Sequence, residues 1–150
     1  MKIPKHFISD FLFDSTDKQQ NKVYQWEQSI VAPLDQTLVK FIWEQEKLKY
    51  PPQVILLPNI TPSWIIGDAT RTTVRFQSSV NTWIILHELA HSMTSQSSGL
   101  TNKHGALFVG VYCKLLKKYI TKNGPHKNVD FVKSAREFGL QVRENAEVVF

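Results

Sequence analysis

Apolar residues recur every three or four positions in several stretches of the chain, and this period is typical of amphipathic helices. One stretch, with Val23 and Trp26 at helical spacing, ends near Pro33, because proline removes a backbone donor and breaks or kinks a helix. Helices are predicted at about Lys18–Ile30, Leu34–Lys49, Ser79–Ser95, His104–Lys122 and Val129–Phe138.

Three shorter segments between the second and third predicted helices have the length and composition of strands. They are Val54–Leu57, Trp64–Gly67 and Thr72–Gln77, separated by turn-prone proline, asparagine and aspartate residues. The helices and these strands together predict an α+β fold with a small twisted sheet of about three strands. A length of 150 residues without internal repeats or low-complexity tracts predicts a single domain over residues 1–150.

Composition excludes several classes of protein. Hydrophobic residues make up 42% and charged residues 21% of the chain, so it is neither disordered nor fibrous. No apolar run is long enough for a membrane helix or a secretory signal, which predicts a cytoplasmic protein that does not contact a membrane. Cys113 is the single cysteine, so a metal site in this chain has to use histidine and carboxylate ligands.

The chain carries a formal net charge of +5, which permits contact with an anionic partner. The densest basic cluster is Lys114, Lys117, Lys118 and Lys122. Its spacing is typical of the solvated face of a helix, and a weak association with nucleic acid is the alternative interpretation.

The segment His87-Glu88-Leu89-Ala90-His91 is an H-E-x-x-H motif inside a predicted helix. Two histidines four positions apart project from one helical face with Cβ atoms about 5–6 Å apart, so both rings reach one ion. The intervening Glu88 lies beside such an ion, where it can act as a general base toward a water molecule. The motif therefore predicts zinc held by His87 and His91, with Glu88 as the catalytic residue; two histidines that merely belong to the helix surface or core are the alternative.

A catalytic zinc ion usually has three protein ligands, and His104 is the best candidate for the third. It follows a polar loop and opens the next predicted helix, where the helix dipole favours a neutral ring. An ordinary helix-terminal histidine is the alternative for His104, and carboxylates rank below it as ligands. Those carboxylates are Glu137, which ranks first among them, Glu144, Glu147 and Asp130, whereas His6 and His126 are interpreted as surface residues.

The two blocks His87–His91 and His104-Gly105-Ala106-Leu107-Phe108 resemble the SprT-like and WLM-type zinc metalloproteases, whose second block has the form H-G-P-x-F. The chain is also similar to small bacterial and phage metallohydrolases that share a Val-Tyr-x-x-Glu segment, matched by Val23, Tyr24 and Glu27. Ala106 stands where the H-G-P-x-F block of the SprT-like and WLM-type proteases has proline, and Leu107 stands where that block often has glutamate. The resemblance implies a minimal zincin fold, with His87, His91 and His104 as zinc ligands and Glu88 as the base.

These observations predict a zinc-dependent metallopeptidase or amide hydrolase acting on a peptide or protein substrate. An extended substrate is expected along an edge strand at Thr72–Gln77, and Tyr112 and Arg75 are candidates for stabilising the charge that develops on the attacked carbonyl. The alternative function is a DNA-associated binding protein on a zincin scaffold with a structural or weakly catalytic zinc site.

Overall fold

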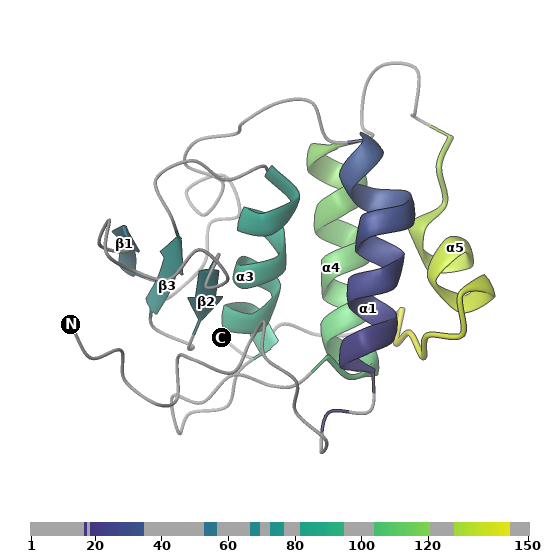
Figure 1. Ribbon diagram of the computed structural model, residues 1–150, viewed down its shortest axis with the longest axis horizontal. Coiled ribbons are helices and arrows are strands. Elements are labelled where there is room, and N and C mark those ends of the chain that lie inside the picture. Colours follow the sequence, from purple (N-terminus) through teal and green to yellow (C-terminus); the bar gives the residue numbers. More distant parts are fainter. Residues whose placement is uncertain are drawn as a thin grey trace.

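The computed structural model describes residue 17 and residues 19–34, 53–56, 67–69, 73–76, 82–94, 104–120 and 128–144. Helix α3 (Thr82–Thr94) lies at the centre of this part of the chain, between a group of short strands and a pair of neighbouring helices (Figure 1). That pair consists of α1 (Gln20–Trp26) and α4 (Ala106–Tyr119), and α5 (Phe131–Glu137) lies beyond it. The motif-bearing helix is therefore covered on both sides.

Three short strands pair through their backbones in the order β1-β3-β2. They are β1 (Gln53–Leu56), β2 (Gly67–Ala69) and β3 (Thr73–Phe76). β1 runs parallel to β3 and β2 runs antiparallel to it, so β3 has a partner on each side. The expected docking of an extended substrate along this segment is therefore wrong, because both hydrogen-bonding edges of β3 are already occupied.

The predicted α+β class, and with it the minimal zincin built on a small twisted sheet, needs correction. About 72% of the residues whose side chains the structure describes are helical, and the strand residues among them are confined to Ala69 and positions 73–75. The strands span only three or four residues each. The described core is built by helix-on-helix packing instead, so this part of the chain is mainly α.

The first helix changes its winding twice before it ends. α1 passes into a π-helix at Glu27–Val31 and then into a 3-10 turn at Ala32–Leu34. Pro33 within that turn has no backbone N–H to continue an α-helical ladder, which accounts for the break predicted near this position. The helix predicted at Leu34–Lys49 lies almost wholly outside the described residues.

Helix α3 is buried along almost its whole circumference, as its all-round apolar pattern predicts. Leu86, Leu89 and Ala90 are at most 1% exposed and pack in one core with residues of the neighbouring helices. α1 contributes Val23 and Trp26 to that core; α4 contributes Phe108, Val109, Val111, Tyr112, Cys113, Leu115 and Leu116.

The chain leaves α5 through a glycine turn and returns to the start of α4. Gly139 has φ of 95°, and Leu140 N–H donates to the carbonyl of Ala135 at 3.0 Å, the pattern of a Schellman C-cap. Further along, Arg143 N–H donates to the carbonyl of Ala106 at 3.0 Å. The segment 140–143 is thereby fixed against the helix that follows His104.

Gly110 of α4 is the point of closest approach to this returning segment. A Cβ atom at Gly110 would overlap the carbonyl oxygen of Arg143 and lie 2.9 Å from its carbonyl carbon. Gly110→Ala is expected to lower the free energy of unfolding by about 1–3 kcal/mol, because overpacking outweighs the better helix propensity of alanine. Urea unfolding measures the change.

Gly105→Ala is the matched control for that substitution, since nothing lies within 4 Å of a Cβ atom at Gly105. An equal stability for the two variants would show that the segment 140–143 does not press against α4.

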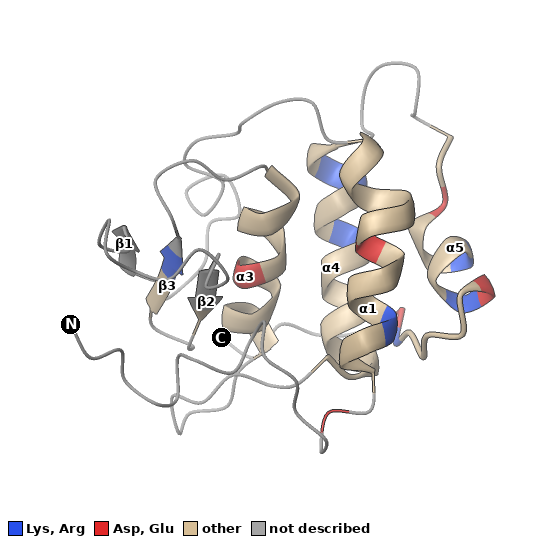
Figure 2. Cartoon of the chain, viewed as in Figure 1, with Lys and Arg blue, Asp and Glu red and all other residues tan. Residues whose placement is uncertain are grey.

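Basic residues gather on the half of α4 that is farther from His104 (Figure 2). Lys114, Lys117 and Lys118 are exposed, as expected of a solvated helix face, and Lys122 lies outside the described residues.

None of the helices in the described part of the chain has the length and apolarity that a membrane span requires.

Candidate metal centre

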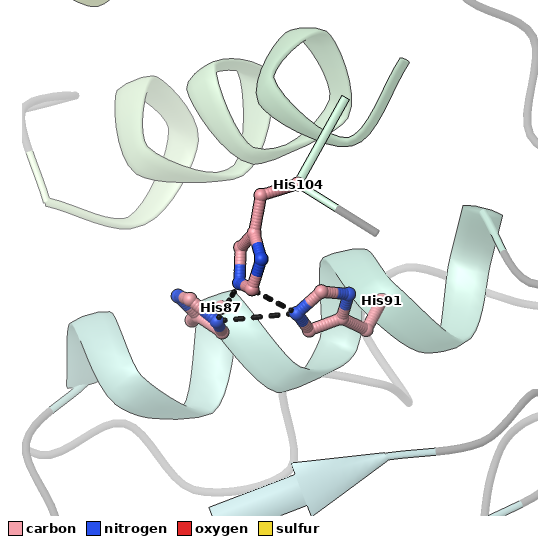
Figure 3. Close-up of side chains that lie close together, drawn as sticks. All are labelled: His87, His91 and His104. Carbon is pink, nitrogen blue, oxygen red and sulfur yellow. Dashed lines mark hydrogen bonds between the residues drawn. The ribbon is translucent and has the colours of Figure 1, made fainter. Parts of the chain in front are cut away.

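The structure brings together the three histidines that the sequence singles out. His87 and His91 project from the same face of α3, and His104 reaches them from the segment immediately before α4 (Figure 3). The Nε2 atoms form a nearly equilateral triangle: His87 to His91 is 3.2 Å, His91 to His104 is 3.1 Å and His87 to His104 is 3.1 Å. All three rings thus direct the same nitrogen to one point.

The cluster is buried. His87, His91 and His104 are 0%, 1% and 2% exposed. The ring of Phe108, in the first turn of α4, stacks on His91 with centroids 4.3 Å apart and meets the edges of the other two imidazoles at 5.1 and 4.9 Å. This packing fixes the ring planes and limits the access of water to the nitrogens.

A carboxylate holds the outer nitrogen of two of the three rings. Glu27 Oε2 lies 2.7 Å from His87 Nδ1, and Asp17 Oδ2 lies 2.7 Å from His104 Nδ1. Both carboxylates are nearly inaccessible, with side-chain exposures of 1% and 6%. Because a carboxylate oxygen accepts hydrogen bonds, the Nδ1 atoms of His87 and His104 carry the protons and donate them.

The position of these protons determines the chemistry of the Nε2 atoms. A neutral imidazole protonated at Nδ1 has a lone pair at Nε2. The Nε2 atoms of His87 and His104 therefore present two lone pairs to each other at 3.1 Å, a contact that is repulsive unless a positive charge lies between them. The arrangement is one that binds a cation.

The size of the triangle fits a metal ion with imidazole ligands. Its centre lies about 1.8 Å from each nitrogen, close to the 2.0–2.1 Å of a zinc–imidazole bond, so His87, His91 and His104 would hold one ion together. Candidate ligand atoms of His87, His91 and His104 all lie within 4.8 Å of one another, and in the described ranges they are the group that meets this criterion for holding a metal. The cluster could therefore bind a metal ion.

Comparison with known proteins gives no further guide. No family model, curated protein or solved structure matches the chain. The resemblance to SprT-like and WLM-type metalloproteases stays a prediction.

Glu88 lies next to the cluster without belonging to it. Its side chain is 0% exposed, and Oε1 is 3.9 Å from His87 Nε2. At that distance the carboxylate is beside the point where the imidazoles converge, which is the place that the motif requires of a general base.

The second hydrogen bond to Asp17 strengthens the anchor of the third histidine. The backbone N–H of His104 also donates to Asp17 Oδ2, at 3.2 Å. Burial raises the pKa of Asp17, but the hydrogen bonds from the ring and backbone of His104 lower it. Their effect outweighs that of burial, so the pKa lies below its ordinary value. Asp17 is therefore an ionised partner at neutral pH.

The alternative carboxylate ligands lie elsewhere. Asp130 caps α5 by accepting from Lys133 N–H at 3.0 Å, and Glu144 pairs with Arg136 at 3.3 Å on the surface. Glu137 is exposed at the end of α5, away from the described metal cluster. His6, His126 and Glu147 lie outside the described residues.

Burial raises the pKa of the Cys113 thiol to about 12, with a contribution from the negative charge of Asp130.

The role of both orienting carboxylates was not predicted from the sequence. Asp17, Gln20, Tyr24 and Glu27 follow one another at intervals of three or four positions, which is the spacing of one helical face. This polar stripe runs beside the apolar face of Val23 and Trp26 and was the available signal. Tyr24 also belongs to the site, since its ring lies edge-on to His104 with centroids 5.3 Å apart.

Tyr112, a candidate for stabilising charge on the substrate, has a different set of contacts. Its hydroxyl donates to Glu27 Oε2 at 2.7 Å, and the residue is 0% exposed. The second candidate, Arg75, is half-buried on β3.

Proposed function

We propose that this protein is a zinc-dependent hydrolase of peptide or other amide bonds, in which His87, His91 and His104 hold the metal and Glu88 is the general base. The observation that carries the proposal is the 3.1 Å approach of the Nε2 atoms of His87 and His104 while their Nδ1 protons are directed to carboxylates. A metal ion held among the three nitrogens would remove the repulsion of this approach, and Glu88 beside it gives the ion a catalytic use.

Zinc is favoured by the donor set. Three neutral imidazoles are typical ligands of a catalytic zinc ion, and hydrogen bonds from their outer nitrogens to carboxylates are the usual supporting contacts. The buried carboxylates of Glu27 and Asp17 together contribute two negative charges, which offset the charge of a divalent ion. A monovalent cation would leave part of this buried charge uncompensated.

Zinc held by the three histidines would supply a Lewis acid for an amide carbonyl and would make water a better nucleophile at neutral pH. The Glu88 carboxylate takes a proton as the water oxygen attacks the carbonyl carbon, and it returns that proton to the nitrogen of the departing amine. His87 and His104 keep their Nδ1 protons throughout, because these protons are held in hydrogen bonds to Glu27 and Asp17. Glu88 thus exchanges a proton during the reaction, whereas His87 and His104 do not.

A peptide or protein substrate and a cytoplasmic location are proposals that follow from the sequence. The alternative, a DNA-associated binding protein with a structural or weakly catalytic zinc site, requires the same histidines, and a structural site gives Glu88 no chemical task. Dependence of turnover on Glu88 therefore separates the two functions.

Metal content is the direct test of the proposed function. The purified protein is expected to contain one zinc ion per chain by elemental analysis, to lose it to a strong chelator, and to regain it on addition of zinc. Because an ion that binds only the folded state stabilises it, chelation is also expected to lower the melting temperature. A chain that takes up no zinc, with its melting temperature insensitive to both treatments, would contradict the proposal.

A further inference from the structure

The hydroxyl group of Tyr112 lies where the three helices of the site meet. Tyr112 is on α4, and its Oη is 2.7 Å from Glu27 Oε2 of the π-helix that continues α1. The same Oη is 3.3 Å from the carbonyl oxygen of Trp83 on α3, one turn before His87. A single buried atom thus contacts all three segments around His87.

We propose that Tyr112 is a positioning residue for the metal centre, which holds the Glu27 carboxylate in the orientation that fixes His87. The proposal rests on the proposed function, since it assigns a role toward the metal that the histidines hold. Tyr112 touches neither metal nor substrate in this role and acts through Glu27.

Glu27 depends on this contact because its hydrogen bonds converge on one oxygen. Oε2 accepts from both His87 Nδ1 and Tyr112 Oη, each at 2.7 Å, whereas the buried Oε1 has no hydrogen-bond partner among the residues that the structure describes. A carboxylate held through one oxygen by two donors has a defined orientation, and one held by a single donor can rotate about its last side-chain bond. Loss of the hydroxyl would therefore loosen the partner of His87.

The backbone beneath Glu27 supports a functional interpretation. Glu27 is the first residue of the π-helix, a wider winding than the α-helix that precedes it. π-Helical turns within α-helices are rare and occur frequently at functional sites. The local winding and the tyrosine act on the same side chain.

Core packing is the competing explanation of Tyr112. Its ring lies edge-on to Trp26 and His87, with centroids 6.0 and 5.5 Å apart, and 5.4 Å from the ring of Phe108. These contacts belong to the ring and not to the hydroxyl. Tyr112→Phe separates the two explanations, because it keeps the ring and removes only the donor.

The test compares zinc affinity, by competition with a chromophoric chelator, in the wild-type protein and in Tyr112→Phe. We expect the dissociation constant for zinc to rise about tenfold, at the lower end of the effect of losing an outer contact to a metal ligand. The ligand-field absorption of the cobalt-substituted protein is expected to change as well, since His87 would bind in a less defined orientation. Tyr119→Phe, on the same helix and outside the cluster, is the control and should change neither property.

A double-mutant cycle shows whether the hydroxyl acts through Glu27. Glu27→Gln is expected to weaken zinc binding at least as much as Tyr112→Phe, and adding Tyr112→Phe to it should have little further effect. Unchanged zinc affinity in folded Tyr112→Phe would overturn the inference. If that variant failed to fold, unchanged affinity in Glu27→Gln would overturn it equally, whereas a wild-type chain that binds no zinc would remove the proposed function itself.

Discussion

Glu88→Gln is expected to reduce the rate of peptide hydrolysis by about 10²–10⁴-fold, the usual contribution of a general base. Glutamine has nearly the same shape as glutamate but cannot take the proton from the attacking water. Zinc content should remain one ion per chain, because Glu88 Oε1 is 3.9 Å from His87 Nε2 and the three imidazoles are unchanged. Turnover of a fluorescently labelled denatured protein and elemental analysis of the same sample measure the two properties.

The exposed Glu137 provides the matched control for this experiment. Glu137→Gln removes the same charge from the surface and should hydrolyse the substrate at the wild-type rate. Undiminished turnover in Glu88→Gln would remove Glu88 as the base. A wild-type protein that binds zinc and hydrolyses no peptide would instead favour the DNA-associated alternative.

His104→Ala is expected to weaken zinc binding by more than the roughly 10–100-fold that follows from loss of an outer hydrogen-bonding contact, since a ligand itself is lost. The substitution also removes the ring that donates to Asp17 at 2.7 Å, so a nearly inaccessible carboxylate loses its main partner. Loss of the ligand weakens zinc binding, and loss of the partner of Asp17 also destabilises the protein without zinc. Chelator competition and thermal unfolding with and without zinc separate them.

His126→Ala is the control, because His126 is interpreted from the sequence as a surface residue and lies outside the described part of the chain. Zinc should bind to this variant as to the wild-type protein. Equal zinc affinity in the two variants would exclude His104 as the third ligand and reopen the choice among the carboxylates.

The site could be predicted from the sequence where its residues lie close together along the chain. His87 and His91 are one helical turn apart, and His104 follows after a single polar loop, so helical spacing and a short connection suffice to bring them together. Glu27 and Asp17 lie 60 and 87 positions from their histidine partners. A local pattern contains no information on contacts of that range, which depend on how α1 packs against α3 and α4.

The fold shows the same division. α3, α4 and α5 lie within the segments that apolar periodicity predicts, because burial of one face and helix formation depend on the same repeat. The π-helix at Glu27–Val31 has no such signal, since Val23, Trp26 and Ile30 fit an ordinary α-helix equally well. The central position of β3 could not be predicted from the sequence either, because strand order depends on the whole sheet and not on any one strand.

Gln19 joins distant parts of the chain at the third histidine: its amide nitrogen donates to the carbonyl of His104 at 2.8 Å, and its amide oxygen accepts from Gln141 N–H at 2.6 Å. Gln19 and Gln141 are 122 positions apart. The backbone of His104 is therefore secured by a relay that is complete only when the first described residues and the segment 140–143 lie side by side.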